Sequence, residues 1–195
     1  MYKYGIIIVI NPGNIMGIKG SLPIPVIRAA SMARGVYWRT MHPLTFGAAI
    51  AITDTNNERI ALVLHTYGRR DYWRLPGGGI DRAEWNIARN RVLIGQFAQT
   101  LPAGLFEGSA RREAKEEVGI DTTEFPLIHL LNYVSDELGN RDTLGIFHLP
   151  LPGIEVADFY PERLEIEEIR LWDIASIGSI PGASYLAEVA RRLQQ

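Results

Sequence analysis

The sequence contains no cysteine among its 195 residues. Disulfide bridges, thiolate metal sites and cysteine nucleophiles are therefore excluded. A chain without cysteine suits a reducing compartment, and we expect the protein to be cytoplasmic. Long hydrophobic runs are missing as well, since the longest early run, residues 5–10, is far too short to span a bilayer. The sequence thus predicts a protein with no transmembrane segment.

Acidic residues are absent from positions 1–53, which hold five basic residues, namely Lys3, Lys19, Arg28, Arg34 and Arg39. The overall net charge of −2 argues against general nucleic-acid binding. We interpret residues 1–43 as a basic N-terminal arm, with a strand over 5–10 and an amphipathic helix over 25–40. Such an arm could dock on a membrane or a partner, or it could present an ordinary solvated face.

Residues 44–195 mix strand patterns with helix patterns. The β-branched runs 46–53 and 60–66 flank a turn and predict a hairpin. Residues 127–134, 143–149 and 169–173 predict further strands, and residues 109–118 and 185–193 predict helices. The segment 76–79, Pro-Gly-Gly-Gly, is expected to be a loop. This mixture indicates an α/β (α+β) fold with a mixed sheet.

The predicted helix 109–118 carries three closely spaced carboxylates. Glu116 and Glu117 follow Glu113 by three and four residues, so all three project from one helical face. Like charges at this spacing repel by roughly 0.2–0.5 kcal/mol per pair, whereas a hard cation such as Mg²⁺ favours carboxylate oxygens. The spacing is compatible with a metal site and also with a solvated acidic face balanced by neighbouring Arg and Lys residues.

The surrounding sequence resembles the Nudix hydrolases. Their signature is Gly, five residues, Glu, seven residues, then Arg-Glu-apolar-x-Glu-Glu-x-Gly-apolar. The matching positions here are Gly78, Glu84, Arg112, Glu113, Ala114, Glu116, Glu117, Gly119 and Ile120. The resemblance covers about residues 44–175 and implies an α/β/α sandwich, an acid-anhydride hydrolase acting on nucleotides, and a homodimer.

The spacing of the signature is irregular, because 27 residues separate Glu84 from Arg112 where the pattern has seven. A second segment, Leu101-Pro-Ala-Gly-Leu-Phe-Glu107, echoes the first loop but lies too close to Arg112. We favour Gly78 as the loop glycine, with residues 85–107 as an insertion that caps the site or builds a dimer contact. Within the insertion, apolar residues from 85 to 93 allow a helix.

The resemblance also implies roles for individual residues. Glu113, Glu116 and Glu117, together with the Gly78 carbonyl, would hold Mg²⁺ or Mn²⁺. Arg112 and Glu84 would form an ion pair that braces the loop against the helix, and Glu107 is the substitute for Glu84. The general base is taken to be Glu165, with a loop containing Asp136, Glu137 and Asp142 as the other source of carboxylates.

Substrate contacts are expected just before the glycine loop. Arg69, Arg70 and Arg74 could pair with a phosphate, and Trp73 could stack on a base, as could Tyr67 and Tyr72. Core or rim packing explains the three aromatic residues better than stacking does, and a solvated turn explains the three arginines equally well. We assign no chemistry to His42, His65, His129 and His148, which show no ligand spacing.

Two functions remain open from the sequence. The first is metal-dependent hydrolysis of a pyrophosphate bond in a nucleoside diphosphate linked to another group, as in ADP-ribose, nucleotide sugars or nucleoside triphosphates. The second is a nucleotide-sensing module with the same fold and little turnover, which the insertion between loop and helix would favour.

Overall fold

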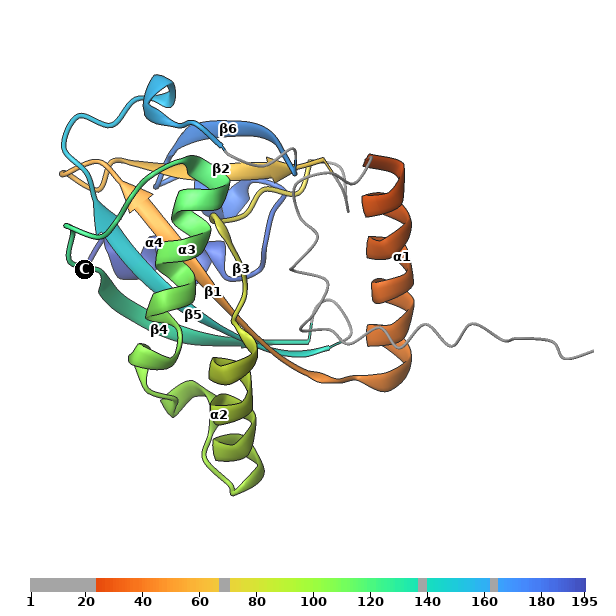
Figure 1. The fold of residues 1–195 in the computed structure, drawn as a ribbon. Helices are drawn as coiled ribbons and strands as arrows, with labels where there is room; N and C mark the ends of the chain where they lie inside the picture. Colours follow the sequence, from red (N-terminus) through yellow and green to blue (C-terminus); the bar gives the residue numbers. More distant parts are fainter. Residues whose placement is uncertain (1–23, 67–70, 137–139, 162–164) are drawn as a thin grey trace, which may run out of the picture.

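The computed structural model describes residues 24–66, 71–136, 140–161 and 165–195. The predicted strand at residues 5–10 lies outside these ranges. Figure 1 shows the helices and strands in chain order: α1 (Ile24–Met41), β1 (Leu44–Thr53), β2 (Arg59–His65), β3 (Gly77–Gly79), α2 (Arg82–Leu93), α3 (Glu107–Val118), β4 (Ile128–Ser135), β5 (Arg141–Pro150), β6 (Ile166–Asp173) and α4 (Leu186–Leu193). No described helix is both long and apolar enough to cross a membrane.

One mixed sheet forms the centre of the molecule. Its strand order is β4-β5-β1-β2-β6, and β3 pairs with β1 outside this path. The central β1–β5 pair is parallel, whereas every other pair is antiparallel. The parallel pair is buried by helices on both sides, as is usual for parallel strands. The predicted mixed sheet is confirmed.

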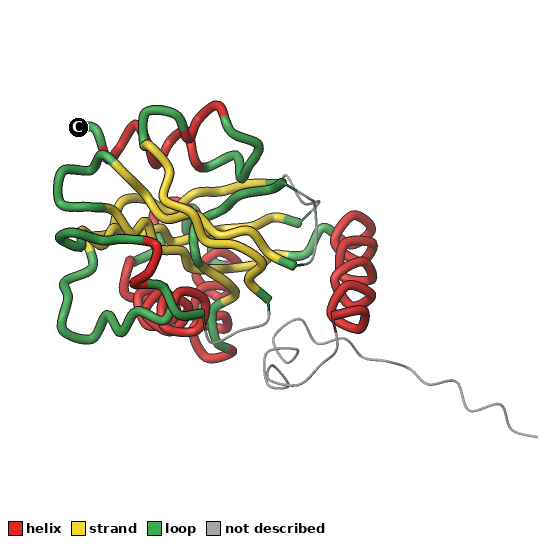
Figure 2. Tube along the Cα trace, turned by 90° about the horizontal axis from the view of Figure 1, so that it is seen from above, coloured by secondary structure: helices red, strands yellow, loops and turns green. Residues whose placement is uncertain are grey.

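Helices cover both faces of this sheet (Figure 2). On one face, Ala110, Ala114 and Val118 of α3 are fully buried against β1, β2 and β5. On the other face, Leu186, Val189 and Leu193 of α4 pack on alternate residues of the same strands. The alternation follows from the two-residue period of a strand, and it produces the α/β/α sandwich expected from the resemblance.

The glycine-rich segment is a strand, not the loop that its composition predicts. β1 and β2 pair at Thr53 and Ile60, at the hairpin end, and residues 73–79 enter the sheet where these two strands diverge. Arg74 exchanges backbone hydrogen bonds with Val63 of β2, and Gly77–Gly79 then pairs with Gly47–Ala49 of β1. A Cβ at Gly77 would collide with the Ala48 carbonyl and with Ala49, so only glycine fits at this position.

The segment 85–107, which we interpret from the sequence as an insertion, packs into the core. Its helix α2 begins at Arg82, before the insertion, and buries Ala88 between Phe46, Phe106 and Phe147. After α2, the chain is tied to β4 by Asn132, whose amide donates to the carbonyl oxygens of Gln99 (3.2 Å) and Leu101 (2.7 Å). The predicted helix in this region is confirmed.

The N-terminal helix α1 matches the expected range 25–40 to within one residue at each end. Figures 1 and 2 both show it set apart from the sandwich, next to the start of β1. Its outward side chains include Met32 and Val36, which are largely exposed. The division into an arm (1–43) and a body (44–195) remains a prediction.

Candidate functional site

Helix α3 fixes the position of the acidic residues. Its alanine stripe lies against the sheet, and Gly119 ends the helix in the left-handed conformation (φ 76°), with its N–H bonded to Lys115. Glu113 and Glu117 lie one turn apart, and both are buried, with 0% and 2% exposure. Glu116 is partly exposed. Burying two carboxylates is costly unless each has a close partner.

Strand β3 supplies one set of partners. A Cβ placed on Gly78 would lie 2.6 Å from Oε1 of Glu113, so this carboxylate rests directly on the glycine backbone. The neighbouring Gly77 N–H donates to Oε2 of Glu117 at 2.7 Å. The glycine strand and the acidic helix are therefore in contact, although many residues separate them in the chain. This contact supports Gly78 over Gly104, around which a Cβ would meet no atom within 4 Å.

His65 holds the other oxygen of Glu117. Its Nε2 lies 3.0 Å from Glu117 Oε1, and both side chains are almost completely buried. His65 is the last residue of β2, on the strand next to the glycine segment. From the sequence we assign this histidine no chemistry, because its partner lies 52 residues away and no local spacing reveals the contact.

Arg112 precedes Glu113 on α3 and contacts both this carboxylate and the glycine strand. Its guanidinium donates to the Gly79 carbonyl oxygen at 2.8 Å and lies 2.8 Å from Glu113 Oε1. Glu116 Oε2 is 3.6 Å away. Arg112 therefore clamps the acidic helix to the glycine strand, which is the bracing role expected for it, though through a different partner.

The expected Arg112–Glu84 ion pair is absent from the described part of the chain. Glu84 instead lies in the first turn of α2, where it forms a capping box with Asp81. The Ser109 hydroxyl donates to Glu84 Oε2 at 2.5 Å. The substitute candidate, Glu107, pairs with Arg111 at 2.8 Å. Glu84 therefore lies on a helix beside the start of α3, where Ser109 and Asp81 are its partners.

The expected substrate contacts are only partly placed by the structure. Arg69 and Arg70 lie outside the described residues, as does Tyr67. Trp73 is 6% exposed and packs edge-to-face on Trp172, with the Arg170 guanidinium 5.1 Å from its ring centre. A core position of this kind leaves little of the Trp73 ring for a base. Burial raises the pKa of Tyr185 above its usual value, and the nearby positive charge of Arg74 opposes this shift.

The carboxylates outside α3 occupy different parts of the fold. The Glu165 carbonyl accepts a hydrogen bond from the Thr66 N–H at 2.8 Å, next to His65 at the end of β2. Asp142 lies in β5 and accepts a hydrogen bond from Thr45 at 2.7 Å; burial raises the pKa of its carboxyl group. Asp136 is exposed after β4, and Glu137 lies outside the described residues. Of these acids, Glu165 is the one that the backbone places beside the His65–Glu117 pair.

The donors around α3 are of the type that binds a hard divalent cation. Glu113, Glu116 and Glu117 offer carboxylate oxygens, and the glycine strand adds backbone carbonyls. Within the residues that the structure describes, no three acidic or histidine side chains are close enough together to hold an ion. Arg112 contacts Glu113, and His65 contacts Glu117. The carboxylates are therefore of the type that binds a cation, but in this structure they are arranged around these internal partners.

Solved structures share this architecture. A Nudix hydrolase from Alicyclobacillus acidocaldarius matches with a TM-score of 0.57 and 14% identity, over 78% of this chain and 92% of that one. An Ap4A hydrolase from C. elegans, solved as a binary complex, gives a TM-score of 0.54 and 16% identity over 77% and 95%. The Nudix domain of NrtR from Shewanella oneidensis, complexed with ADP ribose, gives 0.52 and 15% over 78% and 86%.

No protein-family model matches the chain, and no curated protein matches its sequence. Sequence identities of this size establish an architecture and leave the chemistry to the site itself. The order of the strands, the glycine strand against the acidic helix and the structural matches together give one conclusion: this chain has the Nudix fold.

Proposed function

We propose that this protein is a metal-dependent pyrophosphohydrolase, which hydrolyses the pyrophosphate bond of a nucleoside diphosphate linked to a further group. The observation that carries the proposal is the contact of Gly77 and Gly78 with Glu117 and Glu113. The two segments are in contact although residues 80–106 separate the glycine strand from the acidic helix in the chain. The Nudix fold and the buried carboxylates add support.

The residues of the site have distinct roles in this proposal. Glu113, Glu116, Glu117 and the Gly78 carbonyl would hold Mg²⁺ or Mn²⁺. Such an ion neutralises phosphate charge and lowers the pKa of a bound water molecule. Arg112 keeps the glycine strand against α3 through the Gly79 carbonyl, and His65 with the Gly77 N–H fixes both oxygens of Glu117. Glu117 is therefore held in place before a substrate arrives.

Glu165 is our proposed general base. Its backbone is bonded to Thr66, and the following residue, Ile166, is in register with His65. The carboxylate would accept a proton from the attacking water, which requires it to lie within hydrogen-bonding reach of that water when substrate is bound. Arg69, Arg70 and Arg74 would contact the phosphates that are not attacked.

The substrate class is best sought first among adenosine nucleotides. Two of the structurally similar proteins are an Ap4A hydrolase and a Nudix domain complexed with ADP ribose. We propose ADP-ribose, nucleotide sugars and nucleoside triphosphates as the compounds to compare, together with dinucleoside polyphosphates.

A nucleotide-sensing module is the second candidate, and one observation favours it. In the described residues, Glu113 and Glu117 are held by Arg112 and His65, and no three acidic or histidine side chains gather around one point. A site kept in this arrangement would bind a nucleotide and turn it over slowly.

The test is a release assay over these compounds with Mg²⁺ or Mn²⁺, using the full chain and two matched variants. Glu117→Gln removes the charge at the site, and Glu124→Gln removes one from an exposed position after α3. Turnover that Glu117→Gln abolishes and Glu124→Gln retains supports the hydrolase. No turnover, together with metal-dependent binding of ADP-ribose in calorimetry, supports the sensing module. Circular dichroism of both variants checks that they fold.

A further inference from the structure

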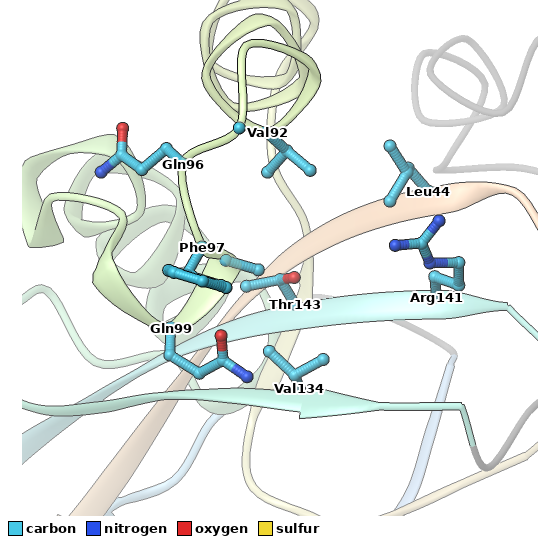
Figure 3. Close-up of a pocket in the computed structure, with 10 residues that line it drawn as sticks. Leu44, Val92, Gln96, Phe97, Gln99, Val134, Arg141 and Thr143 are labelled. Carbon is cyan, nitrogen blue, oxygen red and sulfur yellow. The ribbon is translucent and has the colours of Figure 1, made fainter.

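Residues between Val92 and Gln99 form one wall of a pocket that no residue of α3 lines. The pocket has a volume of about 330 Å³ and is lined by the loop after α2 and by the first residues of β1 and β5. Figure 3 shows its walls: Val92, Phe97 and Gln99 on the insertion side, and Leu44, Arg141 and Thr143 on the sheet side. This volume is in the range of sites for small organic molecules.

Hydrogen bonds hold residues 96–99, which lie on the insertion side of the pocket. The Phe97 carbonyl oxygen accepts bonds from the Thr100 N–H (3.0 Å) and hydroxyl (2.8 Å). The Gln96 amide donates to the Thr100 carbonyl at 2.9 Å, and Asn132 secures the Gln99 carbonyl to β4. A loop tied in this way presents Phe97 in a fixed position, even though 76% of this side chain is exposed. An aromatic ring held out of the core on a fixed loop offers its face to a ligand.

Arg141 faces Phe97 across the pocket, with Thr143 between them (Figure 3). The Arg141 side chain makes no ion pair with any other residue in the described ranges, whereas its backbone N–H is bonded to Pro43. The Gln99 side-chain amide likewise has no hydrogen bond within the described part of the chain. The pocket therefore combines an apolar wall of Leu44, Val92 and Val134 with the Arg141 guanidinium, which has no ion-pair partner among the residues that the structure describes.

We propose that this pocket binds a small aromatic anion, a planar ring that carries one carboxylate or phosphate. The ring would stack on Phe97 between the aliphatic side chains, and the anionic group would pair with the Arg141 guanidinium beside the Thr143 hydroxyl. Gln99 would bond a polar atom at the ring edge. An apolar ligand would leave Arg141 unused, and an inorganic anion would leave the aromatic wall unused.

The pocket is separate from the proposed hydrolytic site. Thr143 is in register with Phe46 near the start of β1, whereas Gly77–Gly79 pairs with the next part of that strand, Gly47–Ala49. No residue of α3 or of Gly77–Gly79 lines the pocket. Binding in the pocket thus requires neither a divalent cation nor any of the α3 carboxylates.

The experiment is a titration of the ¹⁵N-labelled full chain, followed by NMR, in the presence of EDTA. Phenyl phosphate and benzoate are the probes, phenol is the ring without charge, and inorganic phosphate is the charge without a ring. We expect saturable amide shifts at Gly95, Gln99, Val134 and Thr143 with both aromatic anions. The tighter of the two identifies the preferred anionic group. EDTA removes metal-dependent binding, so this result is independent of the proposed hydrolase activity.

Three variants test the assignment. Arg141→Gln should weaken both aromatic anions at least tenfold and leave phenol unchanged, and Phe97→Ala should weaken all ligands that contain a ring. Arg192→Gln, on the opposite side of the sheet in α4, is the matched control and should bind normally. Both pocket side chains are exposed, so neither change removes core packing. Phenol binding as tight as benzoate, shifts confined to Gly77–Gly79, or no binding at all would overturn the proposal.

Discussion

Gly78 and Glu113 are in contact across a gap of 35 positions in the chain, with the carboxylate resting where a side chain at Gly78 would stand. The glycine strand and the acidic helix therefore fix each other. A glycine is required because the buried Glu113 carboxylate needs the space, and the strand is held in place by Arg112 from the same helix. The contact brings both halves of the candidate site together.

Gly78→Ala should displace the Glu113 carboxylate, because a Cβ at 2.6 Å from Oε1 cannot be accommodated without movement. We expect hydrolysis to fall on the order of a hundredfold, as for other small displacements of reacting groups. Gly104→Ala is the matched control, since a Cβ there meets nothing within 4 Å. Steady-state rates of both variants decide the question, and greater loss in Gly104→Ala would point to the second glycine segment.

His65→Leu should impair the site through Glu117, because it removes the partner of Oε1 and leaves the Gly77 N–H as a single restraint. Loss of a residue that orients a metal ligand usually costs about 10–100-fold in affinity or rate. His65→Gln retains a hydrogen-bonding group and should recover part of the loss. Mn²⁺ binding followed by electron paramagnetic resonance provides a readout separate from turnover. Equal Mn²⁺ affinity in all three proteins would show that His65 only fills space.

Gly119→Ala should destabilise the fold through the end of α3. The residue has φ 76°, a conformation that costs about 1–3 kcal/mol for other residues, and its Cβ would also collide with the Tyr160 backbone. Gly153→Ala has a similar φ of 66° with open space around it, so it carries the conformational cost alone. Urea unfolding should show a larger loss for Gly119→Ala. Equal losses would mean that the Tyr160 contact relaxes without cost.

Stability should depend on pH through His148. Burial lowers the pKa of this imidazole below its usual 6.5, and its Nε2 lies 2.8 Å from the Thr53 hydroxyl. Below pH 6.5 the unfolded chain therefore binds a proton that the folded chain excludes, and the free energy of unfolding falls as pH falls through this range. His148→Gln cannot take up that proton. Its urea-unfolding profile should be flatter than that of the parent between about pH 5 and pH 8, and parallel profiles would rule out this histidine as the cause.

Local patterns in the sequence predicted the elements well. The four-residue repeat of Ala110, Ala114 and Val118 located α3 and its buried face, and Gly119 marked its end. The β-branched runs located β1 and β2. These features depend on contacts within one or two helical turns or along one strand, so the local sequence is enough to predict them. The acidic spacing that led to the Nudix resemblance is of the same kind.

Other features were decided by tertiary contacts. The sequence offered Glu84 as the partner of Arg112, but Glu84 lies in the first turn of α2, and Arg112 donates to the Gly79 carbonyl instead. The composition of residues 76–79 predicted a loop, whereas pairing with β1 makes Gly77–Gly79 a strand.

Taken by itself, the sequence determined a face of three carboxylates, an irregularly spaced glycine segment and the helices and strands around them. Only the tertiary structure decided that His65 holds Glu117, that Glu113 is fully buried, and that Gly78 is the glycine that meets the acidic helix. The physical reason is sequence distance. These contacts join residues that are 35 to 52 positions apart, and burial and hydrogen-bond geometry at that separation depend on how the whole sheet packs.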